Sequence, residues 1–174
     1  MHAGREPGKR HADHEVAREY TDAATSPHRP EAGAAGTAVL NLITYGDMLV
    51  RGRPPSEVPA ETAARMAGEV GVHLSGEEQP MKSRRTAAGA LLGYGAGLGI
   101  GALYGVPEDA VPDLPLPLSG ALVGAVAMAA SDVPASATGA TDPRRWGRTG
   151  WLADLIPHFA YGLATVAVYR TLRG

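Results

Sequence analysis

Apolar residues along this chain gather into four stretches without charged side chains, and polar residues fill the segments between them. These stretches are Ala32–Gly46, Thr86–Pro107, Leu114–Ser131 and Leu155–Tyr169. The second holds 22 residues and the third 18. About 20 uncharged, mostly apolar residues are enough for a helix to cross the hydrocarbon layer of a membrane. The pattern predicts an all-α protein, a four-helix transmembrane bundle with spans at about 32–50, 86–105, 115–132 and 151–171.

A soluble helical bundle is the structural alternative, and the second stretch argues against it. A soluble helix of this length shows a polar stripe at a spacing of 3.6 residues. Between residues 86 and 105 the polar positions are Thr86, Tyr94 and Tyr104, which form no stripe. We therefore favour the membrane protein.

The segments outside the spans divide into a tail and two long loops. Residues 1–31 are rich in charge and poor in large apolar side chains, so we expect a disordered tail before a membrane domain at 32–174. The first loop, 51–85, contains an apolar face made by Ala63, Met66 and Val70. That spacing predicts a short amphipathic helix lying on the bundle or on the membrane surface.

Composition adds a packing proposal. The chain has 23 glycines but one Phe and two Trp, so its helices must approach one another closely. Small residues at four-residue spacing allow such approach in membranes. Five glycines in the second span and two in the third follow this pattern: Gly89, Gly93, Gly97, Gly101, Gly105, Gly120 and Gly124. The short connection 106–113 leads us to expect a glycine zipper between these two spans as antiparallel neighbours.

The charged residues predict how the protein is oriented in the membrane and argue against nucleic acid as a partner. A net charge of -2 offers no electrostatic basis for nucleic-acid binding. Basic residues gather in the loops 51–85 and 133–150, which the positive-inside rule places in the cytoplasm of a multi-pass inner-membrane protein. Trp146 and Trp151 flank the start of the fourth span, as interfacial aromatic residues do.

Polar residues inside or at the ends of the spans are the candidate site. The predicted intramembrane cluster consists of Asn41, Tyr45, Asp47, Asp154, His158 and Tyr161. Ionisable groups within membrane helices are costly, so each is a functional candidate. The aspartates, with Asp132, fall at the basic-loop end and could simply pair with arginines, as Asp47 could with Arg51 at i+4.

His158 admits two interpretations. With Asp154 it could relay protons or bind a cation. We favour a structural hydrogen bond from His158 to Asn41 or Asp47 across the helices.

The sequence shows no catalytic or metal-binding constellation. There is no cysteine to act as a nucleophile or zinc ligand. His11, Asp13 and His14 have metal-ligand chemistry but fall in the tail, so no metal or other cofactor is expected. Ser131 beside Asp132, with His158 far along the chain, is not taken as a triad.

Two segments resemble a known group of proteins. Thr37–Met48 followed by Arg51–Pro55, and later Thr141–Trp146 followed by Asp154–Gly162, are similar to segments of small, chiefly actinobacterial membrane proteins without an established activity. The likeness covers about 32–173, although Gly46 and the Arg144–Arg145 pair depart from the usual pattern. The resemblance implies four spans and no particular chemistry.

These features predict a non-enzymatic integral membrane protein that acts as a structural, interaction or accessory subunit. Its expected partners are the lipid bilayer and either further copies of itself or a larger membrane complex. The alternative is a small proton- or cation-conducting transporter that uses the polar cluster.

Overall fold

All regular structure in the described part of the chain is helical. The computed structural model describes residues 28–108 and 114–173. Four long helices are present, α2 (His28–Arg51), α4 (Glu78–Glu108), α5 (Leu116–Ala137) and α6 (Arg148–Arg173). Their connections hold a short helix, α3 (Val58–Glu69), and a 3-10 turn, η1 (Pro143–Arg145). The predicted all-α class is confirmed.

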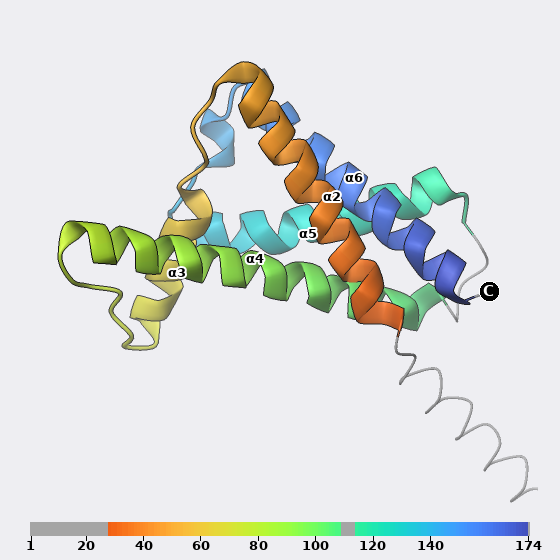
Figure 1. The fold of residues 1–174 in the computed structure, drawn as a ribbon, viewed down its shortest axis with the longest axis horizontal. Helices are drawn as coiled ribbons and strands as arrows, with labels where there is room; N and C mark the ends of the chain where they lie inside the picture. Colours follow the sequence, from red (N-terminus) through yellow and green to blue (C-terminus); the bar gives the residue numbers. More distant parts are fainter. Residues whose placement is uncertain (1–27, 109–113, 174) are drawn as a thin grey trace, which may run out of the picture.

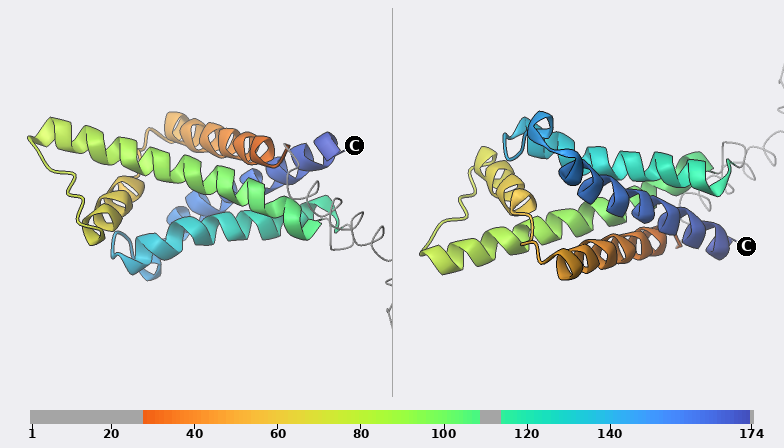
Figure 2. Two further views of the ribbon diagram at one scale, coloured as in Figure 1. Left: turned by 90° about the horizontal axis from the view of Figure 1, so that it is seen from below. Right: turned by 90° about the horizontal axis from the view of Figure 1, so that it is seen from above.

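The four long helices do not pack in the order in which they follow along the chain. α6 packs against α5 on one side and against α2 on the other, and α2 also packs against α4 (Figures 1 and 2). α4 and α5, which are consecutive, meet over a much smaller surface. The expected close hairpin between the second and third spans is therefore not formed. Residues 109–113 of its connection lie outside the described residues.

Three of the long helices are apolar enough and long enough to cross a membrane, not the four that the sequence suggested. They are Glu78–Tyr104 in α4, Leu116–Ala137 in α5 and Arg148–Leu172 in α6. α2 has the length, but Asn41, Asp47 and several Thr and Gly residues lower its mean hydropathy. It nevertheless packs within the same bundle, between α4 and α6.

The helices extend beyond the predicted spans. A charged residue interrupts an apolar stretch of sequence, but it does not interrupt the helix that contains it. α4 begins at Glu78, well before the expected start at residue 86, and its first turns carry Lys82 and Arg84, whose side chains favour helices. α2 likewise begins at His28, so the last residues of the expected tail are helical. The rest of that tail, residues 1–27, lies outside the described residues.

The glycines of α5 pack against α6 rather than against α4. A Cβ on Gly162 of α6 would overlap the carbonyl oxygen of Gly120 and come within 2.6 Å of the Gly124 nitrogen. A Cβ on Gly124 would lie 2.5 Å from the His158 carbonyl oxygen. Only glycine permits these backbones to approach so closely. The partner surface of Gly120 and Gly124 therefore centres on Gly162, which the sequence prediction did not include.

The glycines of α4 serve two other neighbours. A Cβ on Gly89 would meet Pro59 and Ala60 of α3 at 2.7 Å, and one on Gly97 would overlap Thr37 of α2. Gly101 faces α2 through Gly33. Gly93 has open space around it, and the contacts of Gly105 lie outside what the structure describes. The evenly spaced glycines thus divide between two neighbours, because α3 crosses the first half of α4 and α2 packs against its second half.

The interior is built from small residues and a few aromatic rings. Tyr161 and Val166 of α6 pack with Val123 and Ala127 of α5, and Tyr104 of α4 borders this cluster. α3 buries Thr62 and Ala63 and leaves Arg65 and Glu69 exposed, so the predicted short helix in the first loop is present. Val70 of the predicted apolar face, however, lies just past the end of α3 and is 77% exposed. Close helix approach, rather than large apolar side chains, fills the core.

Candidate functional site

Four polar side chains meet where the last third of α5 passes the first half of α6. α5 supplies Ser131 and Asp132, and α6 supplies Asp154 and His158. His158 Nδ1 lies 3.3 Å from Asp154 Oδ1 and 2.8 Å from the Asp154 carbonyl oxygen. His158 Nε2 lies 3.4 Å from Ser131 Oγ. We call these four residues the α5–α6 polar group.

The positions of these side chains along each helix explain how they come together. Asp154 and His158 stand at i and i+4, so they share one face of α6. Both helices also carry an internal proline nearby, Pro134 in α5 and Pro157 in α6. Proline has no N–H to donate, so each leaves a carbonyl oxygen one turn earlier without its helical partner. The polar group therefore lies beside a missing backbone hydrogen bond in each helix.

Two carboxyl groups lie side by side in this group. Asp132 is close enough to Asp154 and to His158 for their charges to interact. The second carboxyl oxygen of Asp154, Oδ2, is buried without a partner among the described atoms. Two adjacent carboxylates repel each other strongly in a desolvated place. This repulsion must be offset by contacts elsewhere in the structure.

The residues of the predicted cluster do not come together in one place. Asp47 of α2 pairs with Arg51 at 3.4 Å and with Arg53 at 2.5 Å. Tyr45 is 62% exposed on the outer face of α2. The partners of His158 come from α5 and α6, so its expected hydrogen bond to Asn41 or Asp47 is not formed. Instead, His158 contacts Ser131 of α5 and Asp154 one turn earlier on its own helix.

Tyr161 belongs to the core rather than to the polar group. Its hydroxyl donates a 2.6 Å hydrogen bond to the carbonyl oxygen of Gly97, and the residue is 1% exposed. A Cβ on Gly36 of α2 would meet the Tyr161 ring. Tyr161 thus ties α6 to α4 and packs on α2, which is a structural role.

Of the three aspartates that were expected to pair with arginines, only one does so. Asp47 is paired in this way, whereas Asp132 and Asp154 face each other and His158. Ser131 and Asp132 are the members that the predicted cluster left out. The only sequence signal for them was their position at the end of an apolar run, at the same end of the predicted bundle as Asp154. Ser131 and Asp132 meet the residues of α6 because the packed helices turn these faces toward each other.

The α5–α6 polar group combines an imidazole, two carboxyl groups and a hydroxyl group, and it resembles neither a hydrolytic nor a metal site. Ser131, His158 and Asp154 follow the order of a hydrolytic triad, but Ser131 lies inside a helix whose backbone N–H groups are engaged, so no oxyanion donors accompany it. Among the described residues, no three His, Asp or Glu side chains are placed to hold a metal ion. His11, Asp13 and His14 lie outside the described residues.

Comparison with known proteins gives no relative. No family model matches the sequence, and neither the curated proteins nor the solved structures contain a match to it.

Proposed function

We propose that this protein is an integral membrane protein whose four long helices all cross the bilayer, and that it serves as a structural, interaction or accessory subunit. One observation carries the proposal: the helices point large apolar side chains outward and small residues inward. Leu91 and Leu103 on α4 are 72% and 69% exposed, and Leu122, Val126 and Phe159 are also exposed. A surface of this kind is costly in water and favourable in lipid.

We include α2 among the membrane-crossing helices because of how its side chains are arranged. It buries Gly33, Gly36 and Thr37 against α4 and α6 while Leu42 and Leu49 face outward. Thr37 offsets its own polarity by donating a 2.8 Å hydrogen bond to the Gly33 carbonyl oxygen. The pairing of Asp47 with two arginines at the helix end reduces the cost of the one charge that α2 brings toward the membrane.

Close packing supports a scaffolding role. The contacts of Gly162 with α5 and of Gly33 with α4 bring helix backbones together and leave little interior space between them. We place the protein in the inner membrane, with the loops 51–85 and 133–150 in the cytoplasm, because basic residues concentrate there. A homo-oligomer or a larger membrane complex would cover part of the outward apolar surface.

The absence of cysteine allows a direct topology test. Ser26→Cys, Ser56→Cys and Thr141→Cys each create the only thiol of the full-length chain. With four spans, a membrane-impermeant maleimide labels Ser56→Cys and Thr141→Cys from one side and Ser26→Cys from the other. If α2 does not cross, Ser26→Cys and Ser56→Cys react from the same side. Release of the parent protein by carbonate would instead establish a soluble bundle.

A second function, proton or cation movement, is favoured by the α5–α6 polar group alone. Two adjacent carboxyl groups and an imidazole at the end of membrane helices can exchange protons with the aqueous side. Purified protein in liposomes with a trapped pH dye tests this. Proton flux that is lost in Asp132→Asn and kept in Asp47→Asn would support conduction, whereas no flux from the parent would refute it.

A further inference from the structure

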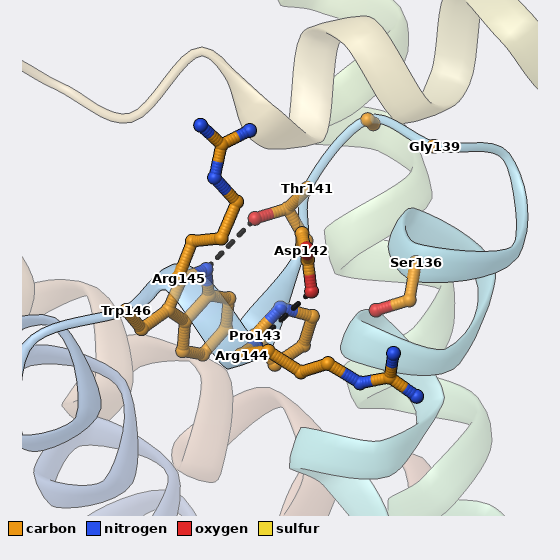
Figure 3. A pocket seen from close by; sticks show the side chains of 9 residues that line it. Ser136, Gly139, Thr141, Asp142, Pro143, Arg144, Arg145 and Trp146 are labelled. Carbon is orange, nitrogen blue, oxygen red and sulfur yellow. Dashed lines mark hydrogen bonds between the residues drawn. The ribbon is translucent and has the colours of Figure 1, made fainter.

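We infer that the loop between α5 and α6 forms a binding site for the headgroup of an anionic phospholipid. Figure 3 shows the pocket, which is lined by Ser136 and by residues 139–146. The inference rests on the proposed membrane placement, because it needs this loop to lie at the level of the headgroups.

The loop is held in a fixed conformation by the end of α5. Gly139 adopts a left-handed φ of 73°, and the Ala140 N–H donates a 2.8 Å hydrogen bond back to the Ala135 carbonyl oxygen. This is the bonding of a glycine-terminated helix. Arg65 of α3 then donates a 2.7 Å hydrogen bond to the Thr138 carbonyl oxygen. The pocket is therefore preformed, which lowers the entropic cost of binding.

The 3-10 turn η1 places two arginines at this pocket. Asp142 caps the turn, its carboxylate accepting a 3.1 Å hydrogen bond from the Arg144 N–H. In Figure 3 the arginine side chains leave the turn in different directions, Arg144 toward Ser136 and Arg145 away from it. A guanidinium beside a hydroxyl group is a donor set that suits a phosphate diester.

The charge of these arginines is not balanced by the protein. At the same end of the bundle Arg51 and Arg53 pair with Asp47, and Arg65 and Arg85 pair with Glu61. In the described part of the chain, Arg144, Arg145 and Arg148 have no acidic side chain within ion-pair distance. Asp142 is the one acid that lines the pocket, so the lining keeps a net positive charge. An anionic ligand complements it.

Aromatic residues fix this site at the membrane interface. The Trp146 indole N–H donates a 2.8 Å hydrogen bond to Thr141 Oγ1. The Trp146 ring meets the Trp151 ring edge-on, with centroids 5.1 Å apart. The apolar span of α6 starts at Arg148, between them. Tryptophan prefers the headgroup level of a bilayer, so the pocket and its free arginines lie where a lipid phosphate would lie.

The only two tryptophans of the chain report on this site, which gives a direct assay. Full-length protein in a neutral maltoside detergent is titrated with short-chain phosphatidylglycerol or phosphatidylcholine while tryptophan fluorescence is recorded. We expect phosphatidylglycerol to bind at least about tenfold more tightly. Each juxtamembrane arginine adds about fivefold to affinity for an anionic lipid surface. Arg144→Gln/Arg145→Gln removes two of them and should therefore lower phosphatidylglycerol affinity about 25-fold and leave phosphatidylcholine binding unchanged.

A matched control removes the same charge from the same end of the bundle. Lys82→Gln/Arg84→Gln lies on the first turns of α4, outside the pocket, and should change affinity less than about twofold. Equal binding of the two lipids, or an equal loss in both double variants, would overturn the inference. Competition by inorganic phosphate at the same concentration as the lipid would assign the pocket to free phosphate and also overturn it. The cysteine topology test is unaffected by these outcomes, so the two proposals fail separately.

Discussion

The end of α2 and the α5–α6 polar group both contain aspartates, but the charges of these aspartates are offset in different ways. Both bring aspartates to the basic-loop end of the bundle. On α2, Asp47 is neutralised by Arg51 and Arg53, its neighbours in sequence. On α5 and α6, Asp132 and Asp154 face each other and His158.

The difference separates a local charge pair from a tertiary one. The partners of Asp47 lie four and six residues along the chain, so they are present wherever α2 packs. The α5–α6 polar group exists only because two helices cross with their polar faces together. A group of adjacent carboxyls opposes folding and must be held by surrounding packing. The close glycine contacts of α5 and α6 supply that packing.

The largest expected effect comes from loosening this packing. Gly162→Ala places a Cβ against the backbone of Gly120 and Gly124, which cannot move aside as a flexible side chain can. We expect a loss of about 2–3 kcal/mol of stability, seen as a clear fall in Tm in detergent. Gly99→Ala is the matched control, because a Cβ there meets open space. An equal Tm for the two variants would contradict the assigned α5–α6 contact.

A smaller effect is expected from the hydroxyl that joins α6 to α4. Tyr161→Phe removes the hydrogen bond to the Gly97 carbonyl oxygen in a buried place and should cost about 1 kcal/mol. Tyr45→Phe removes the same atom from an exposed position on α2 and should leave Tm unchanged. Thermal melts of both variants, followed by circular dichroism, test the distinction. A similar fall in Tm for Tyr161→Phe and Tyr45→Phe would show that the Tyr45 hydroxyl is buried by a partner.

Removing one carboxylate from the α5–α6 polar group should stabilise the protein. Asp132→Asn ends the repulsion with Asp154 while keeping the shape of the side chain, so we expect a gain of up to about 1 kcal/mol at neutral pH. The measurement is again Tm in detergent. A fall in Tm would mean that the charge of Asp132 is required, as it would be with a bound cation.

The smallest change, opposite in sign, is expected at α2. Asp47→Asn leaves Arg51 and Arg53 without their acid, and because these side chains are partly exposed the loss should stay below about 1 kcal/mol. Added salt should reduce the difference from the parent, since screening weakens exposed ion pairs. A loss that is independent of salt would show that the pair is buried.

Several parts of the fold could be predicted because they depend on local pattern. The helices of α4, α5 and α6 follow from uncharged runs, and α3 follows from the spacing of Ala63 and Met66. The Asp47–Arg51 pair follows from helical spacing. The start of α4 at Glu78 could not be read from apolar residues, since charged side chains form helices equally well.

What the sequence by itself determined is the all-α class, the apolar character of α4, α5 and α6, and the dependence on close glycine contacts. Only the tertiary structure decided which glycines meet which helix, and that His158 joins Ser131 and Asp132 rather than Asn41. The physical reason is that a helix repeats its faces every 3.6 residues, so spacing defines a face but not the neighbour that covers it. The rotation of α6 between α2 and α5 makes that choice, and with it creates the α5–α6 polar group.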